Sequence, residues 1–302
     1  MPLADLPSRW ALVLGAVGLL AVSCEGAAGG GAGPDGEAVD AGVPDAAAAV
    51  EDAGKDAGPS VPGCAPGEMT GSSAGSDEEA TAEGLGFHVR VPASYDPTVR
   101  WPLIVVYAPA GADASDTEGF VNLTPVATER GYLVAYADHV SPDDLEAAGC
   151  PTIPALVASK WCVDDRRVYL TGHSDGGSIA MMMVVHEQVS PAAIAPSAAP
   201  VWVGGQVPCP PAVSIMLMHS AVDALCPATG VEDRCGGDLA YWWASCDQCG
   251  LSPGEPLPNG CIAYAGCQAG TEVQFCQGDL PHGYWPGLEE SIVDFFDRFA
   301  LP

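Results

Sequence analysis

A serine set between two glycines is the residue best placed for covalent chemistry. Ser174 is the central residue of a G-x-S-x-G pattern at 172–176, which follows the apolar run 168–171 and precedes a helix-prone stretch. A serine hydroxyl becomes a useful nucleophile when a tight strand-to-helix turn presents it to a base. That turn forces Gly172 and Gly176 close together, so both must be small. The pattern predicts a nucleophile elbow; the alternative is a glycine-rich turn that merely contains a serine.

A nucleophilic serine also needs a base and a carboxylate that orients the base. Asp223 is the candidate acid, because it lies in a turn just after the apolar run 213–218. The carboxyl ends of parallel strands share one edge of a sheet, so this carboxylate should face the serine. Asp233 and Asp238 are rival acids within a cysteine-bearing loop. His282 is the candidate base, in a loop rich in proline and glycine.

The other histidines fit the role of base less well. They precede the serine, lie on a predicted helix or stand too close in sequence to the acid: His88, His139, His173, His186 and His219. His173 is expected to point away from the nucleophile, because it comes one residue before it on the turn. Order along the chain therefore favours His282.

An oxyanion intermediate would need two backbone N–H donors. The first is expected from Asp175, which follows the nucleophile and begins a helix whose dipole favours negative charge. The second is expected from the loop after the apolar run 102–107. Pro109 has no N–H, so Ala110 is the predicted donor.

The elements that must position these groups alternate between strands and helices. Continuous apolar runs are typical of parallel strands that are buried on both faces. The pattern predicts an α/β fold with a doubly wound, mostly parallel sheet. Strands are expected at 86–92, 102–107, 131–136, 167–171, 192–203 and 212–219, and helices at 120–130, 153–159, 178–189 and 288–299.

The chain is strongly acidic. Its 302 residues include 39 Asp+Glu against 10 Lys+Arg, for a formal net charge of −29. Such a surface repels phosphate backbones, so nucleic acid is not expected as a partner. The charge otherwise indicates a well-solvated surface.

The first 63 residues differ in composition from the rest. Residues 1–24 contain an apolar stretch too short to span a bilayer, and they end in a sequence that resembles a bacterial lipobox. We expect Cys24 to carry a lipid that anchors an exported protein to a membrane; ordinary secretion is the alternative. Residues 25–63, rich in Ala, Gly, Asp and Pro, are predicted to form a disordered tether. The catalytic domain is then 64–302.

Cysteine content also favours export. Twelve cysteines in one chain suit an oxidising compartment. Lipidation of Cys24 would leave an odd number, so at least one cysteine is expected to be free. The spacing of Cys246, Cys249, Cys261 and Cys267 is also compatible with zinc. We expect disulfides there instead, with pairings that the sequence leaves open, and neither a metal nor another cofactor.

From residue 86 to its C-terminus the chain resembles exported α/β-hydrolase esterases related to polyhydroxybutyrate depolymerases and to feruloyl and acetylxylan esterases. The matching segments are 89–92 with Tyr95, 162–177, 219–223, 243–249, 261–267 and 282–287. One departure is Ala108-Pro109, where the family usually has His-Gly near the oxyanion hole. The resemblance implies ester hydrolysis through an acyl-enzyme, with Ser174, His282 and Asp223 as the triad.

Three functions follow as hypotheses. The first is a feruloyl- or acetyl-type esterase that acts on plant polysaccharide esters. Its substrate would stack on Trp242, Trp243, Tyr284 and Trp285, and core packing is the alternative role for each of these residues. The second is a depolymerase for polyhydroxyalkanoate oligomers. The third is an inactive hydrolase fold that serves as a surface binding lipoprotein, which the change at Ala108-Pro109 alone would favour.

Overall fold

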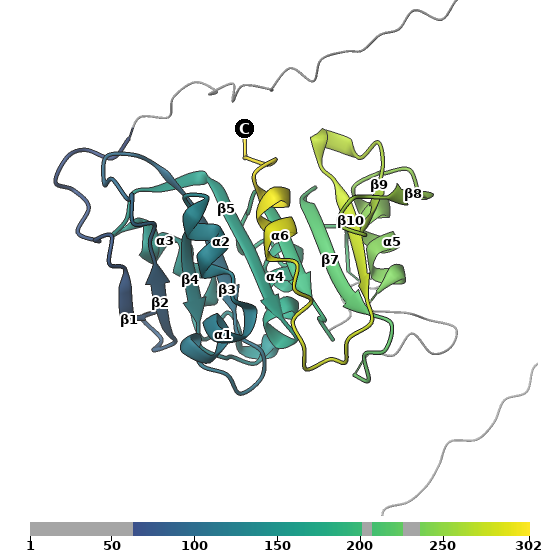
Figure 1. Cartoon of the computed structure of the whole chain (residues 1–302), viewed down its shortest axis with the longest axis horizontal. Coiled ribbons are helices and arrows are strands. Elements are labelled where there is room, and N and C mark those ends of the chain that lie inside the picture. The colour runs from purple at the N-terminus through teal and green to yellow at the C-terminus, as the bar shows by residue number, and fades with distance from the viewer. Residues whose placement is uncertain (1–62, 201–206, 226–235) are drawn as a thin grey trace, which may run out of the picture. The chain divides into compact units, whose positions relative to one another are not determined.

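The computed structural model describes residues 63–200, 207–225 and 236–302, all of which lie in one compact unit, residues 57–302. In this described part, ten strands form a single sheet in the order β1-β2-β4-β3-β5-β6-β7-β10-β9-β8 (Figure 1). The strands from β4 to β10 in that order pair in parallel, and antiparallel strands complete both edges. The mostly parallel α/β sheet expected from the sequence is confirmed.

The elements have the following bounds. The strands are β1 Ser76–Ala80, β2 Gly86–Arg90, β3 Trp101–Tyr107, β4 Leu133–Ala137, β5 Val163–His173, β6 Ala193–Ser197, β7 Ser214–Ser220, β8 Pro253–Pro256, β9 Ile262–Tyr264 and β10 Val273–Gly278. The α-helices are α1 Ala114–Val121, α2 Thr124–Glu129, α3 Ile153–Ala158, α4 Asp175–Val185, α5 Gly237–Cys246 and α6 Glu289–Phe296. Short 3₁₀ turns lie at Pro142–Asp144, Cys150–Thr152 and Gln268–Gly270.

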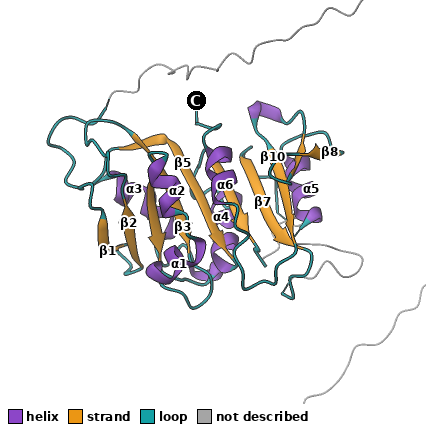
Figure 2. Cartoon of the chain, in the orientation of Figure 1, coloured by secondary structure: helices purple, strands orange, loops and turns teal. Residues whose placement is uncertain are grey.

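Helices cover both faces of the sheet (Figures 1 and 2). Residues of α3, α4 and α5 belong to one hydrophobic core, and residues of α1, α2 and α6 belong to a second. Strand β3 shows why two cores form. Leu103, Val105 and Tyr107 face the first core, whereas Ile104 and Val106 face the second, because successive side chains of a strand point to opposite faces. A strand in this position must be apolar throughout.

The prediction of a single helix at 120–130 is wrong. The structure has two short helices there, because Asn122 adopts a left-handed conformation (φ 46°) that ends α1, and a proline occupies the first turn of α2. Helix α4 begins at Asp175, three residues earlier than expected, since it starts directly after the serine turn. The sequence interpretation did not include β1, β8, β9, β10 and α5. Of these, β1 and β8 are largely exposed and β9 has only three residues.

The disulfides expected among the C-terminal cysteines are confirmed. Cys209–Cys246, Cys249–Cys267 and Cys261–Cys276 brace the C-terminal part of the unit, so the thiols considered for zinc are bonded to one another or to further cysteines. Cys150 is buried and free. Cys226 and Cys235 lie outside the described residues.

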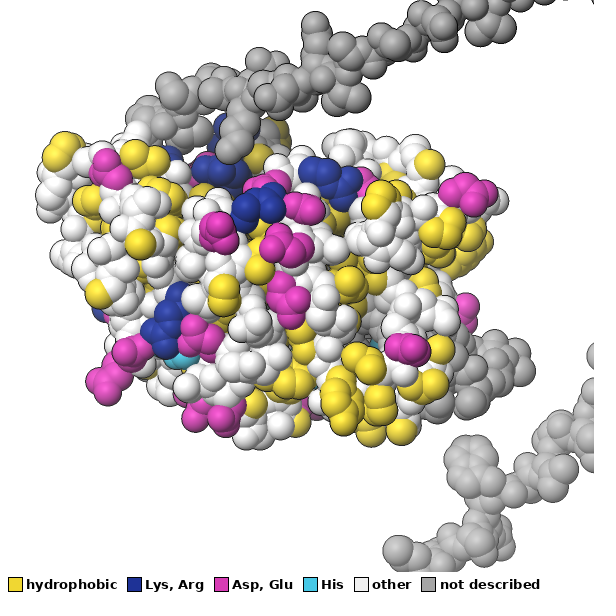
Figure 3. Space-filling view, viewed as in Figure 1, with side chains coloured by type: hydrophobic (Ala, Val, Ile, Leu, Met, Phe, Trp, Pro, Cys, Tyr) yellow, Lys and Arg dark blue, Asp and Glu magenta, His cyan; other side chains and the backbone are white. Residues whose placement is uncertain are grey.

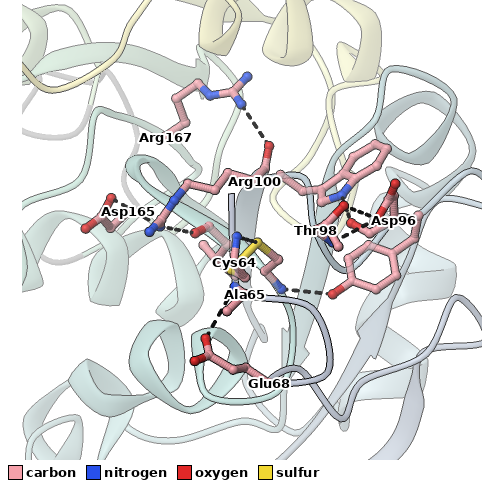
Figure 4. The surroundings of a disulfide bond; sticks show 12 residues. Cys64, Ala65, Glu68, Asp96, Thr98, Arg100, Asp165 and Arg167 are labelled. Carbon is pink, nitrogen blue, oxygen red and sulfur yellow. Dashed lines mark hydrogen bonds and ion pairs between the residues drawn. A yellow bond between two sulfur atoms is a disulfide. The ribbon is translucent and has the colours of Figure 1, made fainter. Parts of the chain in front are cut away.

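A fourth disulfide, Cys64–Cys162, ties the beginning of the described chain to the residue before β5 (Figure 4). The N–H of Cys162 also donates to the Tyr95 hydroxyl at 2.9 Å. Arg100 donates to the backbone oxygen of Val163 at 3.1 Å, next to the same bridge. The start of the nucleophile-bearing strand is therefore held covalently and by hydrogen bonds.

The predicted signal segment 1–24, with Cys24, and nearly all of the tether 25–63 lie outside the described residues. Within the described residues, no helix is both long and apolar enough to cross a lipid bilayer.

Candidate active site

Ser174 occupies a strained turn between β5 and α4. Its backbone has φ 57° and ψ −120°, a combination that few non-glycine residues adopt. A Cβ added to Gly172 would lie 2.6 Å from the backbone of Gly176, and one added to Gly176 would overlap the backbone oxygen of Tyr107. These close approaches explain why both flanking positions hold glycine. The geometry is that of the predicted elbow.

The three predicted side chains meet at this turn. The Nε2 atom of His282 lies 2.8 Å from Ser174 Oγ, and its Nδ1 lies 2.7 Å from Asp223 Oδ2. A carboxylate only accepts hydrogen bonds, so Nδ1 carries the proton and donates to Asp223. Nε2 is then left with a lone pair that accepts from the serine hydroxyl. This is the arrangement a general base requires.

Asp223 is fully buried yet suited to remain ionised. Burial opposes its charge, but hydrogen bonds from His282 and from the Leu225 N–H, the latter at 2.8 Å, outweigh burial and lower the pKa of the carboxyl. His219 Nε2 lies 3.8 Å from the same carboxylate. An ionised Asp223 can orient the ring of His282 and stabilise it when it is protonated.

Parallel pairing of the strands explains the convergence. Strands β5, β6, β7 and β10 run side by side in the same direction, so the residues that follow them share one edge of the sheet. Ser174 follows β5 directly, Asp223 lies three residues beyond β7, and His282 lies four residues beyond β10. Segments far apart in the sequence thereby place their side chains within hydrogen-bonding distance. Of the rival acids, Asp238 lies on α5 and Asp233 lies outside the described residues.

One predicted oxyanion donor, Asp175, lies within the elbow, and the other, Ala110, lies in the loop after β3. Asp175 is the first residue of α4, where N–H groups have no partner within the helix. Tyr107, the last residue of β3, pairs with Gly172, so the loop that contains Ala110 begins beside the elbow. Ala110 is exposed, and its role as a donor stays a prediction.

Two histidines that were set aside as bases have specific contacts at the site. His139 Nε2 lies 3.0 Å from the carboxylate of Asp175, beside the helix start. His173 does not face Ser174, but its Nε2 lies 2.6 Å from the backbone oxygen of His282. Only its position next to Ser174 could have signalled this contact, because the partner is 109 residues away.

The aromatic residues proposed to bind substrate differ in accessibility. Trp243 is fully buried in the first core against Trp242, so its expected contact with substrate is wrong: no part of its side chain is accessible. Trp285 is also buried, with its ring 6.2 Å from that of His173 and 6.4 Å from that of Phe120. Tyr284 is 61% exposed and lines a pocket beside His282.

That pocket has a volume of about 180 Å³. It is lined by His282 and Asp223 of the triad and by residues of the loop after β10, among them Leu280 and Tyr284. Hydrophobic side chains gather at the lower edge of the molecule in Figure 3, where the loops that follow β7 and β10 lie in Figure 1. Substrate atoms near the triad would therefore meet a partly apolar surface.

Comparisons with known proteins agree with this geometry. The chain is 26% identical over 246 residues to feruloyl esterase B of Piromyces equi, and the match covers 71% of this chain. The match spans 45% of that relative, so the chain corresponds to about half of its length. No protein-family model matches the chain.

Solved structures show the fold. An acetyl xylan esterase from Aspergillus awamori superposes with a TM-score of 0.53 at 14% identity, over 74% of this chain and 98% of that one. The S-formylglutathione hydrolase of Staphylococcus aureus gives a TM-score of 0.51 at 12% identity, over 72% and 94% of the two chains. The fold is that of an α/β-hydrolase, as the resemblance in the sequence implied. The similarity to feruloyl esterase B supports the feruloyl esterase part of that resemblance. The expected link to polyhydroxybutyrate depolymerases stays a prediction.

Proposed function

We propose that this chain, an α/β-hydrolase related to feruloyl and acetylxylan esterases, is a serine ester hydrolase that acts through an acyl-enzyme. The single observation that carries the proposal is the continuous hydrogen-bonded series from Ser174 through His282 to the buried Asp223. Such a series has a chemical consequence: it transfers the hydroxyl proton to a base as the oxygen attacks.

The reaction proceeds in two halves. Ser174 Oγ attacks the ester carbonyl carbon while its proton passes to His282 Nε2, and the resulting oxyanion accepts hydrogen bonds from the predicted donors Asp175 and Ala110. The tetrahedral intermediate collapses as His282 protonates the departing alcohol, which leaves an acyl-serine. Water then attacks this ester and gives its proton to His282. Ser174 departs with that proton, and the carboxylic acid is released.

The surface around the triad supports an ester with an apolar or aromatic portion. Val222 and Leu225 on the acid loop are 56% and 64% exposed, and Leu280 and Tyr284 on the base loop are 43% and 61% exposed. Exposed large apolar side chains that cluster at a site commonly mark a binding surface. Together with the similarity to feruloyl esterase B, they favour feruloyl-type esters of plant polysaccharide over simple acetyl esters.

The apolar loops also suit hydroxybutyrate oligomers, the substrate of the alternative depolymerase function. Rates on methyl ferulate, acetylated xylan and hydroxybutyrate oligomers separate these classes. The proposal predicts the largest kcat/KM on the feruloyl ester. A larger kcat/KM on the hydroxybutyrate oligomers than on the feruloyl ester would favour the depolymerase function instead.

A fluorophosphonate probe tests the reaction itself. Wild-type protein should be labelled at Ser174 and should hydrolyse p-nitrophenyl acetate. Ser174→Ala should abolish labelling and lower kcat by about 10⁶-fold, as for other triad nucleophiles. Failure of the wild-type protein in both assays would instead support the surface-binding alternative, for which Ala108-Pro109 is the sequence argument.

Attachment to a membrane through a lipid on Cys24 is part of the same proposal for an exported enzyme. Cys24→Ser should move the protein from the membrane to the soluble fraction. Unchanged fractionation would show that Cys24 is not the anchor.

A further inference from the structure

His173 connects the strand of the nucleophile to the loop of the base. It is the last residue of β5, and its side chain is almost completely buried, with 2% of the residue exposed. Its Nε2 lies 2.6 Å from the backbone oxygen of His282, and its Nδ1 lies 3.1 Å from Ser197 Oγ. Both ring nitrogens therefore have partners, and the partners lie in different segments of the chain.

The chemistry of these partners determines the tautomer of His173. A carbonyl oxygen only accepts hydrogen bonds, so Nε2 must carry a proton and donate to His282. Burial, together with the neighbouring ring of His282, lowers the pKa of His173 to about 4, so the imidazole is neutral at ordinary pH. Nδ1 then has a lone pair, and the Ser197 hydroxyl donates to it.

Ser197 links the same contact to the nucleophile. It is the last residue of β6 and pairs directly with His173 in the parallel register of β5 and β6. Its backbone oxygen accepts a hydrogen bond of 2.9 Å from the N–H of Ser174. One residue thus holds the backbone of the nucleophile and orients the imidazole that holds the base loop.

The base loop has little regular structure of its own. Residues 279–288, between β10 and α6, form turns, and most of their side chains are exposed or half-buried. Trp285 is the buried exception, and its ring packs on His173, as does that of Phe120 with centroids 5.1 Å apart. The loop is therefore held through contacts of His282 and Trp285 with His173.

We infer that His173 is a positioning residue for catalysis: its Nε2–H holds the backbone carbonyl of His282 and so keeps the imidazole of the base in line with Ser174 and Asp223. The inference rests on the proposed function, because it takes His282 to be the general base. His173 contacts neither the nucleophilic oxygen nor the carboxylate. It acts only through the loop.

A matched pair of variants separates this role from simple core packing. The amide nitrogen of glutamine can occupy the position of Nε2 and donate to the carbonyl, whereas asparagine reaches only as far as Nδ1. His173→Gln should keep kcat within about tenfold of wild type. His173→Asn should lower kcat by about 100-fold, with KM changed much less, because small displacements of a base are costly.

The assay measures kcat and KM on p-nitrophenyl acetate, the rate of fluorophosphonate labelling and the melting temperature of each variant. Labelling should fall in parallel with kcat, since it reports activation of Ser174 without turnover. Equal losses of kcat in the Gln and Asn variants would overturn the inference. A change in KM with kcat unchanged would also overturn it. Loss of kcat that simply follows melting temperature would also overturn it.

Ser197→Ala gives an independent test if the His173 variants do not fold. It removes the hydroxyl that donates to Nδ1 of His173 and so orients the ring, but it keeps the backbone contact to Ser174. We expect kcat to fall by about threefold to tenfold, with KM unchanged, and a wild-type kcat would contradict the inference. Wild-type protein and Ser174→Ala are assayed alongside: inactivity of the wild type would reject the proposed function, whereas an active wild type with an active His173→Asn would reject only the positioning role.

Discussion

The elbow of Ser174 and the loop of His282 supply the two ends of one hydrogen bond, yet they are held in different ways. The elbow joins β5 to α4, and its backbone lies against that of β3 so closely that Gly176 has no space for a Cβ. The base loop, residues 279–288, has no helix or strand and depends on contacts with Asp223, His173 and Trp285. One position is determined by local backbone geometry, and the other by side chains from distant segments.

This difference indicates where the site can tolerate change. Strain at Ser174, with its positive φ, persists only because two packed elements surround it. The base loop carries no such close approaches at Gly283, where an added Cβ would meet no atom within 4 Å. A methyl group added at a glycine should therefore be severely damaging in the elbow and mild in the loop. Loss of a hydrogen-bonding side chain that holds the loop should be severe.

The largest effect is expected from Gly176→Ala. The new methyl group would overlap the backbone oxygen of Tyr107, and neither α4 nor β3 can move without disturbing the core. We expect several kcal/mol of destabilisation and no measurable esterase activity. Chemical denaturation and fluorophosphonate labelling measure the two effects. A stable, active Gly176→Ala protein would show that the elbow can adjust its backbone to admit a side chain.

Asp223→Asn should have the next largest effect, and it should act on the base alone. An amide in place of the carboxylate no longer favours the tautomer in which Nδ1 of His282 is protonated. We expect kcat to fall by about 10⁴-fold, with the melting temperature changed by only a few degrees. Steady-state kinetics and circular dichroism provide the readouts. A loss below about tenfold would indicate that another group orients His282.

Asp247→Asn tests a buried carboxyl group that takes no part in the triad. Asp247 follows α5, which packs on β10, and its carboxylate oxygens accept no hydrogen bond of normal geometry from the described residues. Burial raises its pKa from 3.8 to about 6, so the folded state favours the protonated form.

The sign of the pH effect follows from that shift. Wild-type protein should lose stability as pH rises from about 4 to about 6, because Asp247 ionises in the unfolded state over that range while the folded state keeps it protonated. The Asn variant cannot ionise, so at pH 7 it should be more stable than wild type by about 1–3 kcal/mol, with kcat unchanged. Urea denaturation of both proteins at pH 4 and pH 7 measures the difference, and equal stabilities at pH 7 would refute it.

Gly283→Ala should have the smallest effect and serves as the counterpart of Gly176→Ala. It adds the same methyl group one residue after the base, where space is open and φ is not positive. We expect stability within about 0.5 kcal/mol of wild type and a kcat within about threefold. A large loss of kcat would mean that the loop, like the elbow, requires a particular backbone conformation.

Much of the fold could be predicted from sequence because its signals are local. Continuous apolar runs identified β3, β4, β5 and β7, and the G-x-S-x-G pattern identified the elbow. The order of serine, acid and base along the chain led to Asp223 and His282, which the structure brings together. The edge strands β1 and β8 were not predicted, because most of their residues are exposed and give no apolar pattern, and β9 has only three residues. Strand β10 and helix α5 were not predicted either, although both contribute to the hydrophobic core.

The sequence by itself determined the residue types that could react and the strand directions that send them to one edge of the sheet, because side-chain chemistry and apolar periodicity are properties of short segments. Only the tertiary structure decided that Trp243 lies in the core and that His173 reaches the backbone of a residue 109 positions away. Burial and long-range hydrogen bonds arise from how segments pack against one another, and no short stretch of sequence contains that information.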